Sequence, residues 1–244
     1  MKRLLTVMLV VSVFLSMSVT ASATETQFEV PEVSSNTIFF GENVLTKEQN
    51  SEYLASLSSY DLQKIAEKEE YATQISSARK IRAGSLITVP NTYTMYQQET
   101  DNYCIPATVK SILMYINGSS PSQATIADTT GTDPTKIPGY LNDRQDACYY
   151  VYTAKSNFDQ DGMCSKLYST IVNNKVPASM GISGTTSSNW YYATNGHSLA
   201  VFGIYDDYSY IRIGDPLGDR VAGCPYFYSK TASACYNVCT RLVW

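Results

Sequence analysis

Residues 104–118 read Cys-Ile-Pro-Ala-Thr-Val-Lys-Ser-Ile-Leu-Met-Tyr-Ile-Asn-Gly, and this stretch decides the fold. Its apolar side chains recur at the spacing of one helix face, at Ile105, Val109, Ile112, Leu113 and Ile116. Pro106 suits the first helical turn, where its missing N–H costs no hydrogen bond, and Gly118 suits the helix end. The pattern predicts an amphipathic helix that begins at Cys104 and buries one face.

The chain after this helix changes from helical to strand-like patterns. Short helices are expected at 122–128, 136–142 and 161–173. Apolar and β-branched residues at 177–183, 198–205 and 210–213 predict strands, and Asp206-Asp207 supplies a turn between the last two. Helices followed by an antiparallel sheet predict an α+β domain over residues 88–244.

The chain before residue 88 is expected to form a helical appendage. Thr46 and Gln49 have the spacing of a capping box at a helix start. A second helix is expected over 61–82, with Gly84 as its stop. Because so few apolar residues cannot close a core alone, residues 24–87 are predicted to be a pro-segment or accessory region.

The first 23 residues have the pattern of a secretory signal peptide. Lys2 and Arg3 precede an apolar run over 4–19, and the small residues Ala21-Ser22-Ala23 follow. We expect cleavage after Ala23; the alternative, an uncleaved membrane anchor, is disfavoured because the run is short for a membrane span. The mature protein is therefore expected to be secreted or at the cell surface, with no membrane segment.

Composition excludes several classes of protein. Of 244 residues, 44% are hydrophobic and 16% are charged, which is too apolar for a disordered chain. The formal net charge of −4 disfavours a general affinity for nucleic acid or for an anionic membrane.

The chain has six cysteines but only one histidine. A structural zinc site needs four thiolate or imidazole ligands, so an exported chain with a single histidine is a poor candidate, and no metal or cofactor is expected. Disulfides are expected instead, because they persist outside the cell. The sequence leaves their pairing open; Cys148–Cys164 plus one pair within the last sixteen residues is one arrangement, and a free Cys104 would leave one cysteine over.

Cys104 is the candidate nucleophile. A thiol reacts as the thiolate, and both a helix N-terminus and a neighbouring imidazole favour that anion. Cys104 begins the predicted helix, and the only imidazole is His197, at the start of a predicted strand. A structural cysteine or half of a disulfide is the alternative for Cys104, and a structural histidine is the alternative for His197.

Asp215 and Gln98 are the candidate supporting residues. If the strands around Asp206-Asp207 form a hairpin, its open ends bring Asp215 beside His197, where a carboxylate would fix the tautomer of the imidazole. Asp215 could instead cap the turn that follows it. Gln98 lies six residues before Cys104 and is a candidate donor to an oxyanion, with Gln97 as the neighbouring alternative.

These residues resemble a known family. The matching set is Tyr96-Gln97-Gln98, Cys104-x-Pro106-Ala107, Gly196-His197 and Asp215-Pro216. It is similar to the papain-like cysteine peptidases typified by the double-glycine, bacteriocin-leader peptidases of bacteria, and most of all to their stand-alone secreted members. The resemblance covers about residues 88–218. It implies the papain-like fold, in which a helical subdomain packs on an antiparallel sheet with the cleft between them.

By the same resemblance, Cys104 is the nucleophile, His197 the base and acid, Asp215 the orienting group and Gln98 the oxyanion donor. Ile105 stands where the family often has Gly, and it is expected to shape the cleft beside the nucleophile. Trp190 and Tyr191 lie just before His197 and are expected to line the cleft. No phosphate-binding loop or membrane bundle accompanies the domain, so a leader-peptide substrate is not implied.

The expected function is a secreted cysteine peptidase that hydrolyses peptides or proteins through a Cys-His-Asp triad and a thioester. A cell-wall amidase or a transamidase would use the same triad. A non-catalytic, disulfide-braced binding module on the same scaffold is the alternative of a different class. The oligomeric state is left open.

Overall fold

A computed structural model describes residues 38–78 and 84–244, so the predicted signal peptide and its cleavage site lie outside the described residues. Its centre is helix α3 (Cys104–Asn117), which begins and ends where the sequence predicts. Gly118 adopts a left-handed conformation with φ of 69°, and its N–H donates to the Met114 carbonyl. Every residue from Cys104 to Leu113 is buried, so the helix is enclosed on more than its one apolar face.

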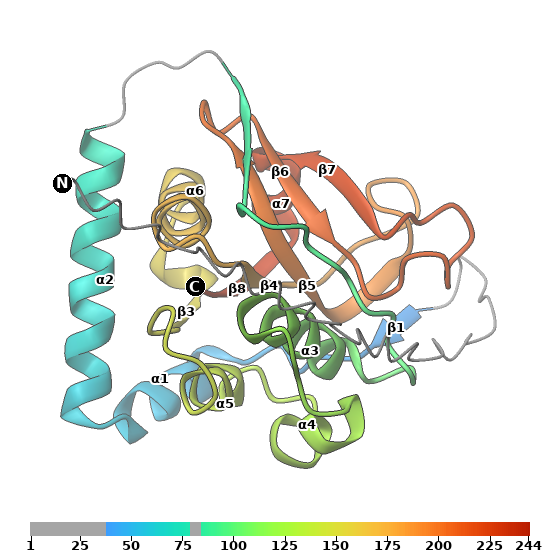
Figure 1. The fold of residues 1–244 in the computed structure, drawn as a ribbon, viewed down its shortest axis with the longest axis horizontal. Helices are drawn as coiled ribbons and strands as arrows, with labels where there is room; N and C mark the ends of the chain where they lie inside the picture. The colour runs from blue at the N-terminus through green and yellow to red at the C-terminus, as the bar shows by residue number, and fades with distance from the viewer. Residues whose placement is uncertain (1–37, 79–83) are drawn as a thin grey trace, which may run out of the picture.

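Two further helices complete the layer around α3. They are α4 (Gln123–Thr130) and α5 (Lys136–Asn142), close to the predicted positions. Ser122 caps α4 with its side chain. The three helices share a buried cluster that includes Ile105, Val109, Ile126, Ile137 and Leu141. Figure 1 shows this group together on one side of the sheet's central strands.

The sheet has eight strands, and its main path runs in the order β3-β8-β4-β5-β6-β7. These strands are β3 (Tyr152–Ala154), β8 (Cys239–Val243), β4 (Ala178–Ile182), β5 (Ala193–Tyr205), β6 (Tyr210–Gly214) and β7 (Phe227–Thr231). Neighbours along this path are antiparallel. The predicted α+β class is therefore confirmed.

The hairpin of β5 and β6 forms around the predicted turn at Asp206-Asp207, with Ala200 opposite Gly214 in the register. Beyond the turn, Tyr208 has a positive φ of 63°, and its N–H donates to the Tyr205 carbonyl.

A second group of helices covers the other main core cluster. It comprises α6 (Gln160–Tyr168), a π-helical turn (Ser169–Asn173), a short 3-10 turn (Lys155–Asn157) and α7 (Ala232–Val238). The single helix expected over 161–173 is thus two kinds of helix in succession. Met163, Leu167 and Ile171 bury their side chains in this cluster against the sheet.

The N-terminal part is joined to the rest of the molecule. Helix α1 (Lys47–Ser56) has the predicted capping box between Thr46 and Gln49, and α2 (Ser59–Ser77) follows. Strands β1 (Ile38–Phe40) and β2 (Leu86–Thr88) both add to β5. The boundary expected at residue 87 therefore falls inside a strand, and the extension of α2 expected to residue 82 lies mostly outside the described residues.

Helix α2 runs beside α6 (Figure 1) and is fixed there by polar contacts. Lys166 pairs with Glu69, and Lys68 Nζ donates to the Trp244 carbonyl at 2.6 Å. Desolvation lowers the pKa of Lys68 to about 8. Among the described residues, no helix is both long and apolar enough to cross a bilayer.

None of the six cysteines is in a disulfide in this structure, so the expected disulfides are not formed. Cys148 and Cys164 lie in different surroundings: Cys148 is near Lys68, whereas Cys164 and Cys239 both influence the pKa of Cys235 in the core.

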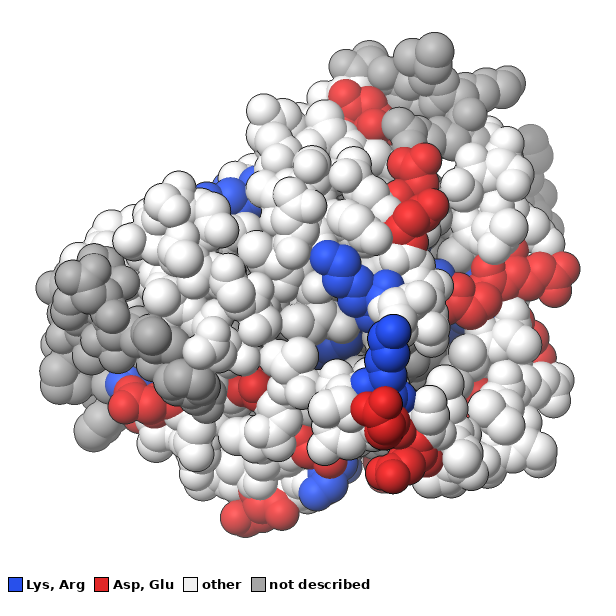
Figure 2. Space-filling view, turned by 180° about the vertical axis from the view of Figure 1, so that it is seen from behind, with Lys and Arg blue, Asp and Glu red and all other residues white. Residues whose placement is uncertain are grey.

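Charged side chains of both signs are interspersed among uncharged ones on the face shown in Figure 2.

Candidate active site

Cys104 is the first residue of α3 and has no exposed surface. Helix α3 packs on β5, and one turn after Cys104 the Thr108 hydroxyl donates to the Ser198 carbonyl at 3.1 Å. Burial raises the pKa of the Cys104 thiol well above its usual value, and the Glu42 carboxylate raises it further. The backbone of Ser198 and of Ile105 acts in the opposite direction. In this closed arrangement the sulfur is therefore a protonated thiol.

His197 lies in β5, directly before Ser198, whose backbone lowers the pKa of the Cys104 thiol. Its Nε2 is 3.1 Å from the Asp215 Oδ1. Because a carboxylate only accepts, this bond assigns the proton to Nε2 and leaves Nδ1 with a lone pair. Nδ1 is buried and has no hydrogen-bond partner among the described residues. The imidazole is thus oriented with one nitrogen held and the other able to accept a proton.

Asp215 follows β6, and the hairpin brings it to His197 as the sequence predicts. It has no exposed surface. Burial by itself would raise its pKa, but the hydrogen bond and charge interaction with His197 and the hydroxyls of Tyr192 and Tyr228 outweigh burial, so the pKa lies below its usual value. Asp215 also accepts from the Leu217 N–H at 2.9 Å, which is the turn-capping role considered as the alternative. One side chain serves both purposes.

Two tyrosines hold the second oxygen of this carboxylate. The hydroxyls of Tyr192 and Tyr228 each donate to Asp215 Oδ2 at 2.6 Å, and Trp190 Nε1 donates to the Tyr228 oxygen at 3.1 Å. Sequence reasoning missed both phenols. The signal for Tyr228 lies in the strand register, because Tyr228 stands opposite Ile213, two residues before Asp215.

Gln98 is completely buried in the loop before Cys104. Its Nε2 donates to the carbonyls of Thr100 at 2.8 Å and Asp101 at 3.0 Å, so both amide hydrogens are used within the loop. Its Oε1 has no partner among the described residues. Gln97 points elsewhere and donates to the Gly218 carbonyl. Of the two glutamines, Gln98 is the one that bonds within the loop leading to Cys104, and its oxyanion role stays a prediction.

The expected substrate-binding residues have different surroundings. Trp190 is 4% exposed and acts on Asp215 through Tyr228. Tyr191 is half-buried, with its ring against Tyr228, and keeps some surface for a ligand. Ile105 has no exposed surface and packs in the helical cluster, so the expectation that it shapes the cleft is wrong for this state: the helix directs it into the core.

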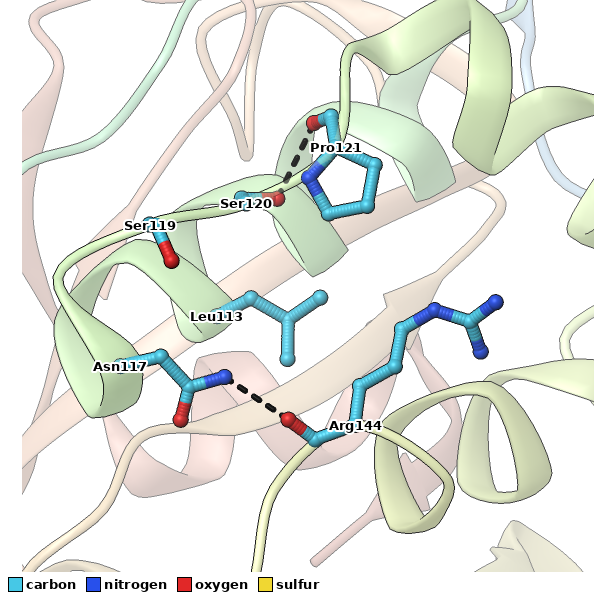
Figure 3. A pocket seen from close by; sticks show the side chains of 6 residues that line it. All are labelled: Leu113, Asn117, Ser119, Ser120, Pro121 and Arg144. Carbon is cyan, nitrogen blue, oxygen red and sulfur yellow. Dashed lines mark hydrogen bonds between the residues drawn. The ribbon is translucent and has the colours of Figure 1, made fainter.

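A separate cavity of about 350 Å³ lies at the other end of α3. Figure 3 shows Leu113, Asn117 and Arg144 around it, with the Asn117 amide bonded to the Arg144 carbonyl. Among the described residues, Arg144 is the one charged side chain that lines it, and the guanidinium stacks over the Tyr140 ring at 3.7 Å. The described residues that line this cavity include no cysteine, histidine or carboxylate.

Comparison with known proteins gives a family. Residues 90–241 match the model described as the Peptidase_C39 like family. No curated protein matches the chain. Among solved structures, xylellain, a cysteine protease from Xylella fastidiosa, is similar with a TM-score of 0.46 and 11% sequence identity, over 88% of this chain and 98% of that chain.

The family match spans more than half of the chain and includes Cys104, His197 and Asp215. The papain-like fold expected from the sequence agrees with it. The chain belongs to the Peptidase_C39-like family and is a cysteine-type peptidase.

Proposed function

We propose that the protein is an exported peptidase in which Cys104, His197 and Asp215 form the catalytic triad. The observation that supports this most is the imidazole of His197, whose Nε2 is held by Asp215 at 3.1 Å while its Nδ1 has no partner in the part of the chain that the structure describes. His197 belongs to β5, on which α3 packs, and the backbone of the next residue, Ser198, acts on the Cys104 thiol. A helix N-terminus and an imidazole are the two groups that favour a thiolate.

In the proposed reaction His197 Nδ1 takes the thiol proton, and the Cys104 sulfur attacks the carbonyl carbon of a peptide bond. The carbon–nitrogen bond breaks, the imidazolium gives its proton to the departing amine, and a thioester remains. Water then attacks the thioester carbonyl, the carbon–sulfur bond breaks and the carboxylic acid product leaves, and the proton that the water loses returns through His197 to the sulfur. Asp215 stays ionised and stabilises the imidazolium.

Alkylation with iodoacetamide at pH 6, followed by peptide mapping, tests this assignment in the full chain. We expect Cys104 to react at least about tenfold faster than in His197→Ala, because the imidazole accepts the thiol proton once the sulfur becomes accessible and so favours the thiolate. Cys148 is a partly exposed thiol away from any helix start and serves as the internal control, with equal rates in both chains. Equal rates at Cys104 would favour a non-catalytic binding module.

Release of amine from peptides, compared with release from cell-wall muropeptides, separates a peptidase from an amidase on the same triad. We expect hydrolysis of peptides, and its loss in Cys104→Ser. Activity on muropeptides alone would assign the triad to the amidase class.

A further inference from the structure

A short N-terminal segment, residues 38–43, lies over the candidate active site. Strand β1 runs parallel to β5, and the Thr194 hydroxyl donates to the Phe39 carbonyl at 2.8 Å. The next two N–H groups, of Gly41 and Glu42, both donate to the Gly196 carbonyl, at 2.8 and 3.1 Å. Gly196 directly precedes His197. The segment is therefore added to the strand that carries the base, which is how extended peptides bind to sheet edges.

Gly41 lies directly against the nucleophile. A Cβ atom at this position would be 2.6 Å from the Cys104 Sγ, closer than such atoms approach one another. Gly196 is equally constrained, because its own Cβ would collide with the Glu42 carbonyl. Two glycines thus allow the segment to lie against the sulfur, and this contact contributes to the burial of Cys104.

Glu42 places its carboxylate in a buried, fully built site. Arg241 Nε donates to Glu42 Oε1 at 3.0 Å, and Nη2 donates to Oε2, so the pair is bidentate. Both side chains are 1% exposed. Gly181 lies beneath the carboxylate, where a Cβ atom would collide with Glu42 Oε1.

Arg241 is fixed independently of the segment. Its Nη1 donates to the Ser179 hydroxyl at 2.7 Å and its Nη2 to the Ser198 hydroxyl at 2.8 Å, so the guanidinium is oriented by β4 and β5. Within residues 38–78 and 84–244, Glu42 is the sole acidic partner in an ion pair with Arg241. If the segment leaves, a buried arginine is left without a counter-charge, which is costly, and a carboxylate from another peptide would remove that cost.

We propose that Arg241, oriented by Ser179 and Ser198, is a carboxylate-binding subsite of the cleft, that Glu42 of this chain occupies it as a tethered inhibitor, and that the site selects peptides with an acidic side chain at the corresponding position. The proposal rests on the function proposed above. The order along the segment supports it: the residue against the sulfur is followed at once by the residue that reaches Arg241.

The first experiment measures release of the cover in the full chain. Glu42→Gln removes the charge but keeps the shape, so we expect Cys104 to be alkylated at least about tenfold faster than in the unaltered chain. Glu52→Gln, at an exposed position on α1, is the matched control and should change nothing. An unchanged rate in Glu42→Gln would overturn the tethered-inhibitor half of the proposal.

The second experiment measures the subsite itself by binding, without catalysis. Labelled peptides Ile-Phe-Phe-Gly-Glu-Asn and Ile-Phe-Phe-Gly-Gln-Asn are titrated by fluorescence anisotropy into the chain with Glu42→Gln and Cys104→Ser. We expect the glutamate peptide to bind at least about tenfold more tightly. Arg241→Lys should reduce this ratio, because an ammonium lacks the planar fork. Equal binding of the two peptides to the chain that keeps Arg241 would show that Arg241 is not a carboxylate-binding subsite.

The outcomes separate the two proposals. If the chain hydrolyses peptides with no preference for the acidic residue, the subsite fails and the peptidase stands. If the glutamate peptide binds selectively but neither hydrolysis nor dependence of Cys104 on His197 is found, the subsite stands and the proposed mechanism fails. If Arg241→Lys does not fold, the difference in binding between the glutamate and glutamine peptides, measured on the chain that keeps Arg241, still tests the subsite.

Discussion

Asp215 and Glu42 are both carboxylates with almost no exposed surface, but their surroundings differ in kind. Asp215 is held by two phenols, a backbone N–H and the imidazole of His197, none of which carries a permanent charge. Glu42 faces the permanent charge of Arg241. A carboxylate surrounded by neutral donors keeps its charge for a histidine that gains and loses a proton. A carboxylate that neutralises an arginine can be exchanged for another one.

The largest effect expected is that of Asp215→Ala on hydrolysis. Without the carboxylate nothing fixes the tautomer of His197 or stabilises the imidazolium, so we expect kcat/KM for a cleaved peptide to fall by about 10³–10⁴. Steady-state kinetics measure this fall, and the alkylation of Cys104 at pH 6 should slow in parallel. A loss of less than tenfold would assign Asp215 to the turn alone.

Arg241→Ala is expected to be the most destabilising change on the other side of the comparison. It leaves the Glu42 carboxylate buried without its partner, and such losses cost about 3–5 kcal/mol in free energy of unfolding. Urea unfolding measures it. The double variant Glu42→Met and Arg241→Met should recover most of this loss, because the buried charges disappear together. A double variant as unstable as the single one would contradict the comparison.

Tyr228→Phe and Tyr192→Phe sharpen the description of Asp215. Each removes one hydroxyl that donates to the carboxylate, and hydrogen bonds to charged groups contribute about 1.5–3 kcal/mol. Each change should raise the pKa of Asp215 from its lowered value, because the ionised form loses a donor. Chemical denaturation and titration followed by NMR measure the two effects. Tyr191→Phe, whose ring only packs nearby, is the control.

The lowered pKa of Asp215 also sets a pH dependence of stability. A carboxyl with a lower pKa in the folded than in the unfolded state, where it is about 3.9, stabilises the fold above that value. This contribution is lost as the pH falls through the folded pKa. We expect unfolding free energy to decline below about pH 4, and more gently in Asp215→Asn. Identical slopes for both chains would argue against the shift.

The smallest change expected lies in α1, far from either carboxylate. Thr46→Ala removes the capping hydroxyl and should cost about 1 kcal/mol in unfolding free energy. Rates of Cys104 alkylation should stay unchanged, since the capping box contacts neither the sulfur nor Arg241. A faster rate would mean that α1 helps to hold the cover in place.

Local patterns predicted the parts of the fold that local forces stabilise. Helix α3 and the hairpin of β5 and β6 carry their periodicity, cap and turn within a few residues, and the hairpin brought Asp215 to His197 as expected. Strands β1, β2 and β8 are short and exist because of partners far along the chain. The same reason hid the pairing of Glu42 with Arg241, which are 199 positions apart. No local spacing signals a contact of that range.

The six cysteines show the limit of reasoning from the cellular compartment. Export led to an expectation of disulfides, but the structure buries Cys164, Cys235 and Cys239 in the core without a disulfide between them and leaves Cys148 elsewhere. Ile105 shows the limit of reasoning from a neighbour in sequence. It directly follows Cys104, but one step along a helix turns the side chain by about 100°, which points it into the core.

The anchoring of α2 to α6 keeps the segment over Cys104, residues 38–43, tethered to the rest of the molecule. If residues 38–43 lift away as proposed, we expect helices α1 and α2 to stay attached through these contacts, so the displaced segment would remain tethered close to Cys104. For short flexible linkers the effective concentration of such a group is in the millimolar range. A free peptide therefore competes with a segment whose local concentration does not fall when the protein is diluted. One cut between residues 43 and 46 would release the segment and remove this effect irreversibly.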